Sequence, residues 1–178
     1  MRKMTQGSIA RHLIAYALPL ILGNLFQLTY NAVDSIVIGK FAGENALAAV
    51  SAANPVMTIM ILGVSGVSIG ASVLMSRFYG AGDDAGMRRT YGLMTVGTQA
   101  ASLLFMLAAL LFPEGIVRLF SPDEQVVALG SSYLRIIAVS YPFLALTRGG
   151  GTLLQSTGRV MIPFVGSLIS VAVNIVLN

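Results

Sequence analysis

Long apolar runs alternate with short polar segments along almost the whole chain. Each run is close to the roughly 20 residues that an α-helix needs to cross the hydrocarbon core of a bilayer. The segments between the runs are polar, glycine-rich or contain proline, as is typical of loops. The pattern therefore predicts an all-α fold, a polytopic transmembrane helical bundle. Its five predicted spans are residues 13–38, 53–75, 90–112, 126–146 and 160–178.

These spans leave four predicted connecting loops, at residues 39–45, 77–89, 113–125 and 147–159. Pro19 and Pro142 fall inside spans, where the loss of a backbone hydrogen bond allows a kink. Pro55 and Pro163 fall near predicted span starts, where proline suits the first helical turn. The sequence therefore allows kinks in the first and fourth spans.

Composition supports the membrane interpretation. Of the 178 residues, 56% are hydrophobic and only 10% are charged, whereas soluble domains carry roughly 25% charged residues. The first apolar run is too long for the core of a signal peptide and has no small-residue cleavage site, so we interpret it as a retained span. The sequence has no cysteine, which excludes disulfides, thiol chemistry and cysteine-bound metals.

The basic residues alternate from loop to loop. Only Lys40 and Arg118 lie in the first and third loops, while eight others lie in the N-terminal segment and in the second and fourth loops: Arg2, Lys3, Arg11, Arg77, Arg88, Arg89, Arg148 and Arg159. By the positive-inside rule, this distribution predicts a multi-pass protein of the cell membrane with a cytoplasmic N-terminus. No basic stripe with interleaved aromatic residues is present, so the net charge of +4 does not indicate a nucleic-acid partner.

A polar stripe runs along the first predicted span. Asn24, Gln27, Asn31 and Asp34 are spaced by three, four and three residues, which places them on one helical face. An aspartate near the centre of a span costs about 2.5 to 3.5 kcal/mol on insertion scales, so we expect this face to line a protein interior or a wet cavity. In the alternative interpretation, Asp34 lies close enough to the end of its span to reach the lipid headgroups.

The last span carries a second polar pair. Asn174 and Asn178 are four residues apart and so lie on one helical face. They either contribute to a site or join neighbouring helices by hydrogen bonds. No loop, charge or aromatic anchor follows this span, so we expect the sequence to break off within or just beyond a helix.

Several enzyme classes are disfavoured. The segment "GAGDDAG" from Gly80 lacks the glycine spacing of a dinucleotide-binding loop, and "RGGG" from Arg148 lacks the lysine and hydroxyl residue of a phosphate-binding loop. His12 is the only histidine, so the chain can assemble neither a Ser-His-Asp relay nor a histidine metal cluster. We therefore expect a protein that is not an enzyme and has no cofactor.

Several motifs together resemble one family of transporters. The segment "QLTYNAVDSIVIGKFAGENALAAV", residues 27–50, closely resembles the first helix and following loop of the multidrug and toxic compound extrusion (MATE) family. A glycine-rich second span, the loop "SRFYGAGDDAGMRR" at residues 76–89, "LLQSTGRVMIPF" at 153–164 and "VNIVLN" at 173–178 follow in that family's order. The resemblance covers nearly the whole chain.

The resemblance implies a fold, a function and a site. It implies that residues 1–178 form the N-terminal lobe of a transporter built from two six-helix lobes, without the sixth helix, and that the missing C-terminal lobe is needed for transport. It implies export of cationic or aromatic compounds in exchange for Na⁺ or H⁺. Asp34 matches the family's first-helix carboxylate implicated in cation coupling. Asn174 and Asn178 match the fifth-helix positions that complete a cation site as asparagine and aspartate in some members, so one carboxylate of that site is missing here.

The residues are chemically adequate for either coupling ion. Asp34 alone can take up a proton, and Asp34 with the amide oxygens of Asn174 and Asn178 offers Na⁺ the hard oxygen ligands that it prefers. Two other functions remain open. A lipid-linked sugar flippase of the same superfamily should have a more cationic cavity, and Arg135 is the only basic residue inside a predicted span. The isolated chain could also be a membrane fragment that does not transport.

Overall fold

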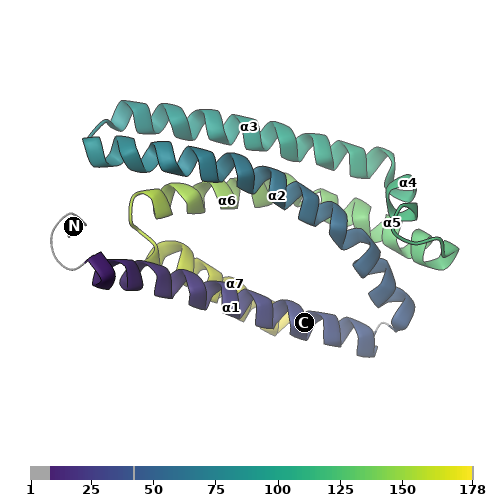
Figure 1. Cartoon of the computed structure of the whole chain (residues 1–178). Helices are drawn as coiled ribbons and strands as arrows, with labels where there is room; N and C mark the ends of the chain where they lie inside the picture. The colour runs from purple at the N-terminus through teal and green to yellow at the C-terminus, as the bar shows by residue number, and fades with distance from the viewer. Residues whose placement is uncertain (1–8, 42, 178) are drawn as a thin grey trace. The chain divides into compact units, whose positions relative to one another are not determined.

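The computed structural model describes the backbone of residues 9–41 and 43–177 and the side chains of residues 10, 13–41 and 43–175. Within these ranges the chain is all-α, without strands, which confirms the predicted fold class (Figure 1). Its helices are α1 (Ile9–Phe41), α2 (Glu44–Ala81), α3 (Asp84–Leu111), α4 (Pro113–Arg118), α5 (Glu124–Ala138), α6 (Tyr141–Ser156) and α7 (Met161–Leu177).

The helices are long and apolar enough for a membrane protein. Segments Leu13–Phe41, Glu44–Ala81 and Asp84–Leu111 each qualify as a membrane span, and α5 and α6 together form a fourth span that is bent by 49°. The fifth predicted span corresponds to α7, a shorter helix of 17 residues, or about 25 Å at 1.5 Å per residue. Each predicted span is therefore helical, although most boundaries differ.

The described chain divides into two compact units, which we describe separately. Unit 1 consists of residues 9–34 and 158–177, that is, most of α1 together with α7. Unit 2 consists of residues 35–157 and contains α2 to α6. The end of α1 also belongs to unit 2, where Gly39 approaches Leu47 of α2.

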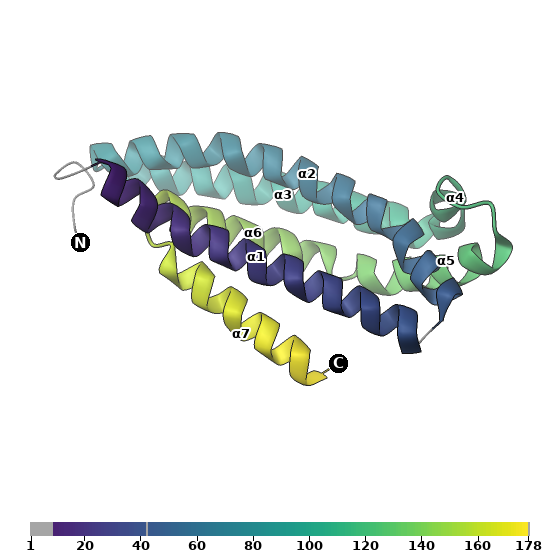
Figure 2. The same cartoon turned by 60° about the horizontal axis from the view of Figure 1, so that its bottom comes forward.

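Unit 2 is built around α2, which packs against α3, α5 and α6. Figure 2 shows α2 and α3 running antiparallel beside each other, with α6 alongside them. Its largest buried side chains include Met60, Leu134 and Tyr141, each 0% exposed. Small residues such as Ala49 and Gly130 let these helices approach closely, which is how membrane helices gain packing energy without a hydrophobic driving force.

Polar contacts hold α2 at both ends. Near its start, the Asn45 amide nitrogen donates to Gln125 Oε1 of α5 at 2.9 Å. Near its end, the Ser76 hydroxyl donates to the Ser156 carbonyl of α6, and the Ser156 hydroxyl donates to the Ser72 carbonyl, each at 3.4 Å. Both ends of α2 are therefore fixed to the bent α5–α6 pair.

The predicted loop at residues 77–89 is mostly wrong, because only residues 82 and 83 separate α2 from α3. Gly82 closes α2 in the left-handed conformation, with φ 74° and ψ 16°, which glycine adopts without a steric cost. The Asp83 carboxylate then accepts a hydrogen bond from Gly86 N at 2.9 Å and caps the start of α3. Turn chemistry therefore ends and restarts the helix within two residues.

The predicted loops at 113–125 and 147–159 also contain helix. Pro113 is the first residue of α4. Proline suits this position because an N–H group in the first turn would have no carbonyl acceptor within the helix. The helix α6 continues to Ser156 through three successive glycines, of which Gly149 is buried. A Cβ atom at Gly149 would lie 3.5 Å from Met94 Cε of α3. Glycine serves helix packing here, which explains why it does not mark a loop.

The position of Pro55 also differs from the prediction, because this residue lies inside α2 instead of near its start. Proline has no N–H, so the Ser51 carbonyl loses its helical donor. The break between α5 and α6 agrees with the kink that Pro142 allows, since the same loss affects the Ala138 carbonyl. Tyr141 lies at this break, and its buried hydroxyl has no hydrogen-bond partner in the part of the chain that the structure describes.

Candidate functional site

The predicted polar stripe lies on α1, within unit 1. Asn24, Gln27 and Asn31 are exposed and Asp34 is partly buried. The Gln27 amide nitrogen donates to Asn31 Oδ1 at 3.3 Å, which is a direct sign that residues four apart share one face. The surrounding side chains of α1, such as Leu25 and Leu28, are also exposed and apolar. The stripe is therefore a narrow polar band on an apolar helix.

The second predicted group lies on α7 of the same unit. The Phe164 ring of α7 lies 3.6 Å from where a Cβ atom at Gly23 of α1 would be, so the two helices touch there. Figure 2 shows that α1 and α7 run in the same direction. Asp34 lies eleven residues beyond Gly23 and Asn174 ten residues beyond Phe164, so both lie about 15 Å further along their helices. Asp34 and Asn174 therefore lie at matching levels.

Asn178, the third predicted cation ligand, lies outside the described residues. Asn174 is partly buried on α7. Carboxylate and amide oxygens are the donors that a hard cation such as Na⁺ prefers, and Asp34 with Asn174 supplies one of each. The assignment of these residues to cation coupling stays a prediction.

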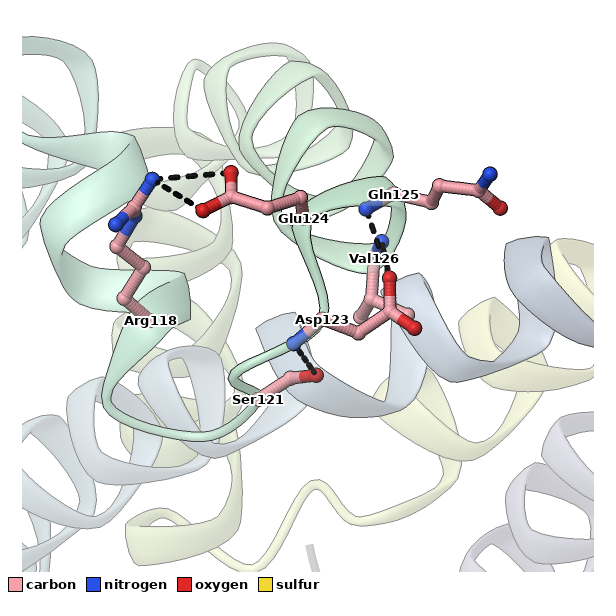
Figure 3. Close-up of polar contacts among 6 residues, drawn as sticks. All are labelled: Arg118, Ser121, Asp123, Glu124, Gln125 and Val126. Carbon is pink, nitrogen blue, oxygen red and sulfur yellow. Dashed lines mark hydrogen bonds and ion pairs between the residues drawn. The ribbon is translucent and has the colours of Figure 1, made fainter.

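A second polar cluster, in unit 2, surrounds the start of α5 (Figure 3). Arg118 Nη2 lies 2.9 Å and 3.0 Å from the two carboxylate oxygens of Glu124. The Asp123 carboxylate caps α5 by accepting hydrogen bonds from the backbone N–H groups of Gln125 and Val126. Both members of the ion pair are exposed, by 55% and 75%. The ion pair joins α4 to the first turn of α5, and the Asp123 cap fixes the start of α5.

Sequence reasoning gave little weight to two features of unit 2. Arg135, the arginine inside the fourth predicted span, is exposed on α5. In the sequence it stands out as the single charge in a long uncharged run. The freed Ser51 carbonyl in α2 was missed because Pro55 was assigned to a helix start. The mostly apolar stretch before Pro55 could have indicated that the helix already begins at Glu44, which places Pro55 in its interior.

Comparison with known proteins identifies the family. The sequence pattern of the MatE family matches residues 19–178. The match covers most of the chain, including the α1 stripe and α7. The chain therefore belongs to the MatE family, and with its apolar helices it is part of a multi-pass membrane protein.

Several curated relatives resemble the chain along nearly its full length. It is 28% identical over 176 residues to "Probable multidrug resistance protein YoeA" of Bacillus subtilis (strain 168), covering 99% of this chain and 38% of that protein. It is 26% identical to "Probable multidrug resistance protein YpnP" of the same organism, covering 97% of this chain and 39% of the relative. It is 28% identical to "Multidrug export protein MepA" of Staphylococcus aureus (strain bovine RF122 / ET3-1), covering 97% and 38%.

The chain thus spans about two fifths of the length of these relatives. The matched part holds the candidate site residues on α1 and α7. The activities named for these relatives therefore belong to proteins that are longer than this chain.

Proposed function

We propose that this chain works as the N-terminal lobe of a secondary active transporter that exports cationic or aromatic compounds in exchange for Na⁺ or H⁺. The observation that carries the proposal is the polar stripe that ends at Asp34, on a helix of a MatE-family chain. The names of the relatives, which refer to multidrug resistance and multidrug export, support the same function.

Asp34 is the group that we assign to ion coupling. A carboxylate in surroundings of low dielectric constant is stabilised when a cation neutralises it. We propose that Asp34 takes up the coupling ion when the site is open to the outside, with Asn174 and Asn178 supplying amide oxygens if that ion is Na⁺. Neutralising Asp34 lowers the cost of moving α1 through apolar surroundings and favours release of a cationic substrate.

The topology follows from charge. Basic residues mark two places in the chain: Arg2, Lys3 and Arg11 lie near the N-terminus, and Arg77, Arg88 and Arg89 lie in the helix ends on either side of the turn between α2 and α3. We therefore place both in the cytoplasm of the cell. The connection between α4 and α5 then lies outside. Alternating access requires one lobe to move against another, so we assign transport to the full-length protein and not to this portion alone.

The test uses the full-length protein in proteoliposomes, with efflux of a fluorescent cationic dye driven by a Na⁺ gradient or a pH gradient, one at a time. Asp34→Asn should lower gradient-driven efflux by roughly tenfold or more, because the ion no longer acts on the transport cycle. Asp84→Asn makes the same chemical change at an exposed residue in the first turn of α3 and should have no effect.

The two coupling ions give different results with a second variant. Asn174→Ala should raise the Na⁺ concentration needed for half-maximal efflux if Na⁺ is the ion, and should leave proton-driven efflux unchanged if only Asp34 binds H⁺. Gradient-driven efflux that persists in Asp34→Asn at normal expression would show that the proposed coupling role is wrong.

A further inference from the structure

The exposed face of α3 is apolar along most of the helix. Its exposed residues between Arg89 and Phe112 are Gly92, Leu93, Val96, Gly97, Ala100, Leu103, Leu104, Leu107 and Leu111. Leu93 and Leu111 are 18 residues apart, or about 27 Å at 1.5 Å per residue, which is close to the roughly 30 Å of a hydrocarbon core. Arg89 is exposed at one end of this apolar band, and Glu114 is exposed at the other. The band therefore shows which length of unit 2 the hydrocarbon core covers.

The connection that follows α3 stays beside the end of this band. The short helix α4 packs against α5 (Figure 1), and its Val117 is 0% exposed. Val117 Cγ1 lies 3.0 Å from where a Cβ atom at Gly130 would be. Gly130 lies six residues beyond Glu124, the first residue of α5, which is about 9 Å along the helix. The α4 helix therefore lies back against α5 instead of projecting away from the ends of the spans.

Three large apolar side chains are exposed on this connection. Phe112, Leu119 and Phe120 are 67%, 80% and 44% exposed. Phe112 directly follows Leu111, the last residue of the apolar band, which is itself 69% exposed. Leu119 comes seven residues after Phe112, or about two helical turns, so the two side chains lie on the same side of α4. The apolar surface of α3 therefore continues onto α4.

The charged groups of this connection do not attract anionic lipid. Residues 112–125 contain one arginine, Arg118, and three acids, Glu114, Asp123 and Glu124, which gives a net charge of −2. The guanidinium of Arg118 is already paired with both carboxylate oxygens of Glu124 (Figure 3). Anionic headgroups attract basic segments and repel acidic ones. Apolar contact is therefore the force that can bind this connection to a bilayer.

We propose that the connection inserts Phe112, Leu119 and Phe120 into the lipid bilayer at the boundary between headgroups and acyl chains. Lipid is the occupant that we assign to this apolar patch, because the patch continues the apolar band of α3 and lies at its end. Helices held at a membrane surface bury an apolar face by about 5–10 Å at this boundary. In the topology proposed above, the patch enters the outer leaflet. The insertion fixes the level of unit 2 in the membrane and does not depend on the proposed transport function.

The experiment uses the full-length protein in liposomes of zwitterionic lipid, with one spin-labelled cysteine at a time. This chain has no cysteine, so only cysteines outside it need replacement by serine. Leu119→Cys tests the patch, and Glu114→Cys is the matched control at an exposed polar position of the same helix. Collisions of the label with oxygen, which dissolves in lipid, are compared with collisions with a water-soluble nickel complex. The ratio of oxygen to nickel collisions should be at least about threefold higher at 119 than at 114, because Leu119 lies among acyl chains.

Three results would overturn the proposal. Equal ratios at 119 and 114 would show that the patch faces water. A label at 119 that neither reagent reaches would show that the rest of the full-length protein covers the patch. A ratio at 119 that rises when anionic phosphatidylglycerol is added would show that charge, and not apolar contact, holds the connection.

Two further variants keep the test decisive. Leu104→Cys lies inside the apolar band, where Leu104 is 68% exposed, and gives the ratio of a label in the hydrocarbon core. The ratio at 119 should fall between those at 104 and 114, as expected for the boundary between headgroups and acyl chains. If Leu119→Cys does not fold, Phe120→Cys carries the same prediction.

Discussion

Unit 2 and unit 1 use similar apolar helices in different ways. In unit 2, Met60, Leu134 and Tyr141 are completely buried, and polar contacts fix both ends of α2. In unit 1, Val160, 6% exposed, is the one buried residue among those whose side chains the structure describes. Apolar helices thus supply a packed core in unit 2 and have mostly exposed side chains in unit 1.

The difference shows where a membrane protein can place polar groups. A helix that packs on several sides, like α2 in unit 2, satisfies its buried hydroxyls within itself, as the Ser68 hydroxyl does by donating to the Val64 carbonyl at 2.8 Å. The α1 helix can carry a polar band up to Asp34 because none of its described side chains is buried in a core. We infer that unit 2 is the scaffold and that unit 1 carries the coupling site.

The largest expected effect on stability tests this contrast with one substitution in each unit. A Cβ atom at Gly130 would lie 3.0 Å from Val117 Cγ1 and 3.3 Å from the Ala49 carbonyl oxygen. Gly130→Leu should therefore lower the free energy of unfolding by about 1–3 kcal/mol through overpacking. The matched change Gly166→Leu on α7, where nothing lies within 4 Å, should have little effect. Thermal unfolding in detergent measures both, and equal losses would break the comparison.

A smaller effect is expected at the turn between α2 and α3. Asp83→Ala removes the carboxylate that accepts from Gly86 N, and loss of such a cap costs about 0.5–2 kcal/mol. Asp84→Ala, one residue later, removes an exposed carboxylate that does not cap the helix and should cost less. Denaturant unfolding of the two variants gives the difference, and an equal loss in both would show that charge matters here and capping does not.

The smallest effect is expected at the exposed ion pair before α5. Arg118 and Glu124 are 55% and 75% exposed, and exposed pairs contribute about 0–1 kcal/mol. A double-mutant cycle with Arg118→Gln and Glu124→Gln should give a coupling energy below about 1 kcal/mol that decreases at high salt. A larger, salt-independent coupling would mean that this pair is shielded from water in the full-length protein and that unit 2 continues into a larger packed region.

The sequence predicted the helical class and the positions of the spans, because apolar runs and bilayer thickness are both read directly from it. It did not predict the helix ends well. Glycine and polar residues at 77–89 and 147–159 were interpreted as loops, whereas Gly82 and Asp83 alone make the first turn and the glycines of α6 lie within a helix. Which glycine breaks a helix depends on backbone conformation and on neighbouring helices, and a single sequence contains neither.

The candidate site shows a similar division. Helical spacing correctly placed Gln27 and Asn31 on one face, as their hydrogen bond demonstrates. Asp34 and Asn174 lie at matching positions along their helices because α1 and α7 touch at Gly23 and Phe164. Residue spacing within one helix cannot predict a contact between two helices. The exposure of Arg135 likewise depends on which face of α5 unit 2 buries.

The two-residue turn between α2 and α3 also has a consequence for biosynthesis. Closing a connection of this length takes little entropy, and contacts between helices that are adjacent in sequence form faster than contacts between distant ones. The α2–α3 pair can therefore assemble as a hairpin once α3 has been translated and inserted, before α5 and α6 emerge. The later helices would then dock onto a surface that already exists.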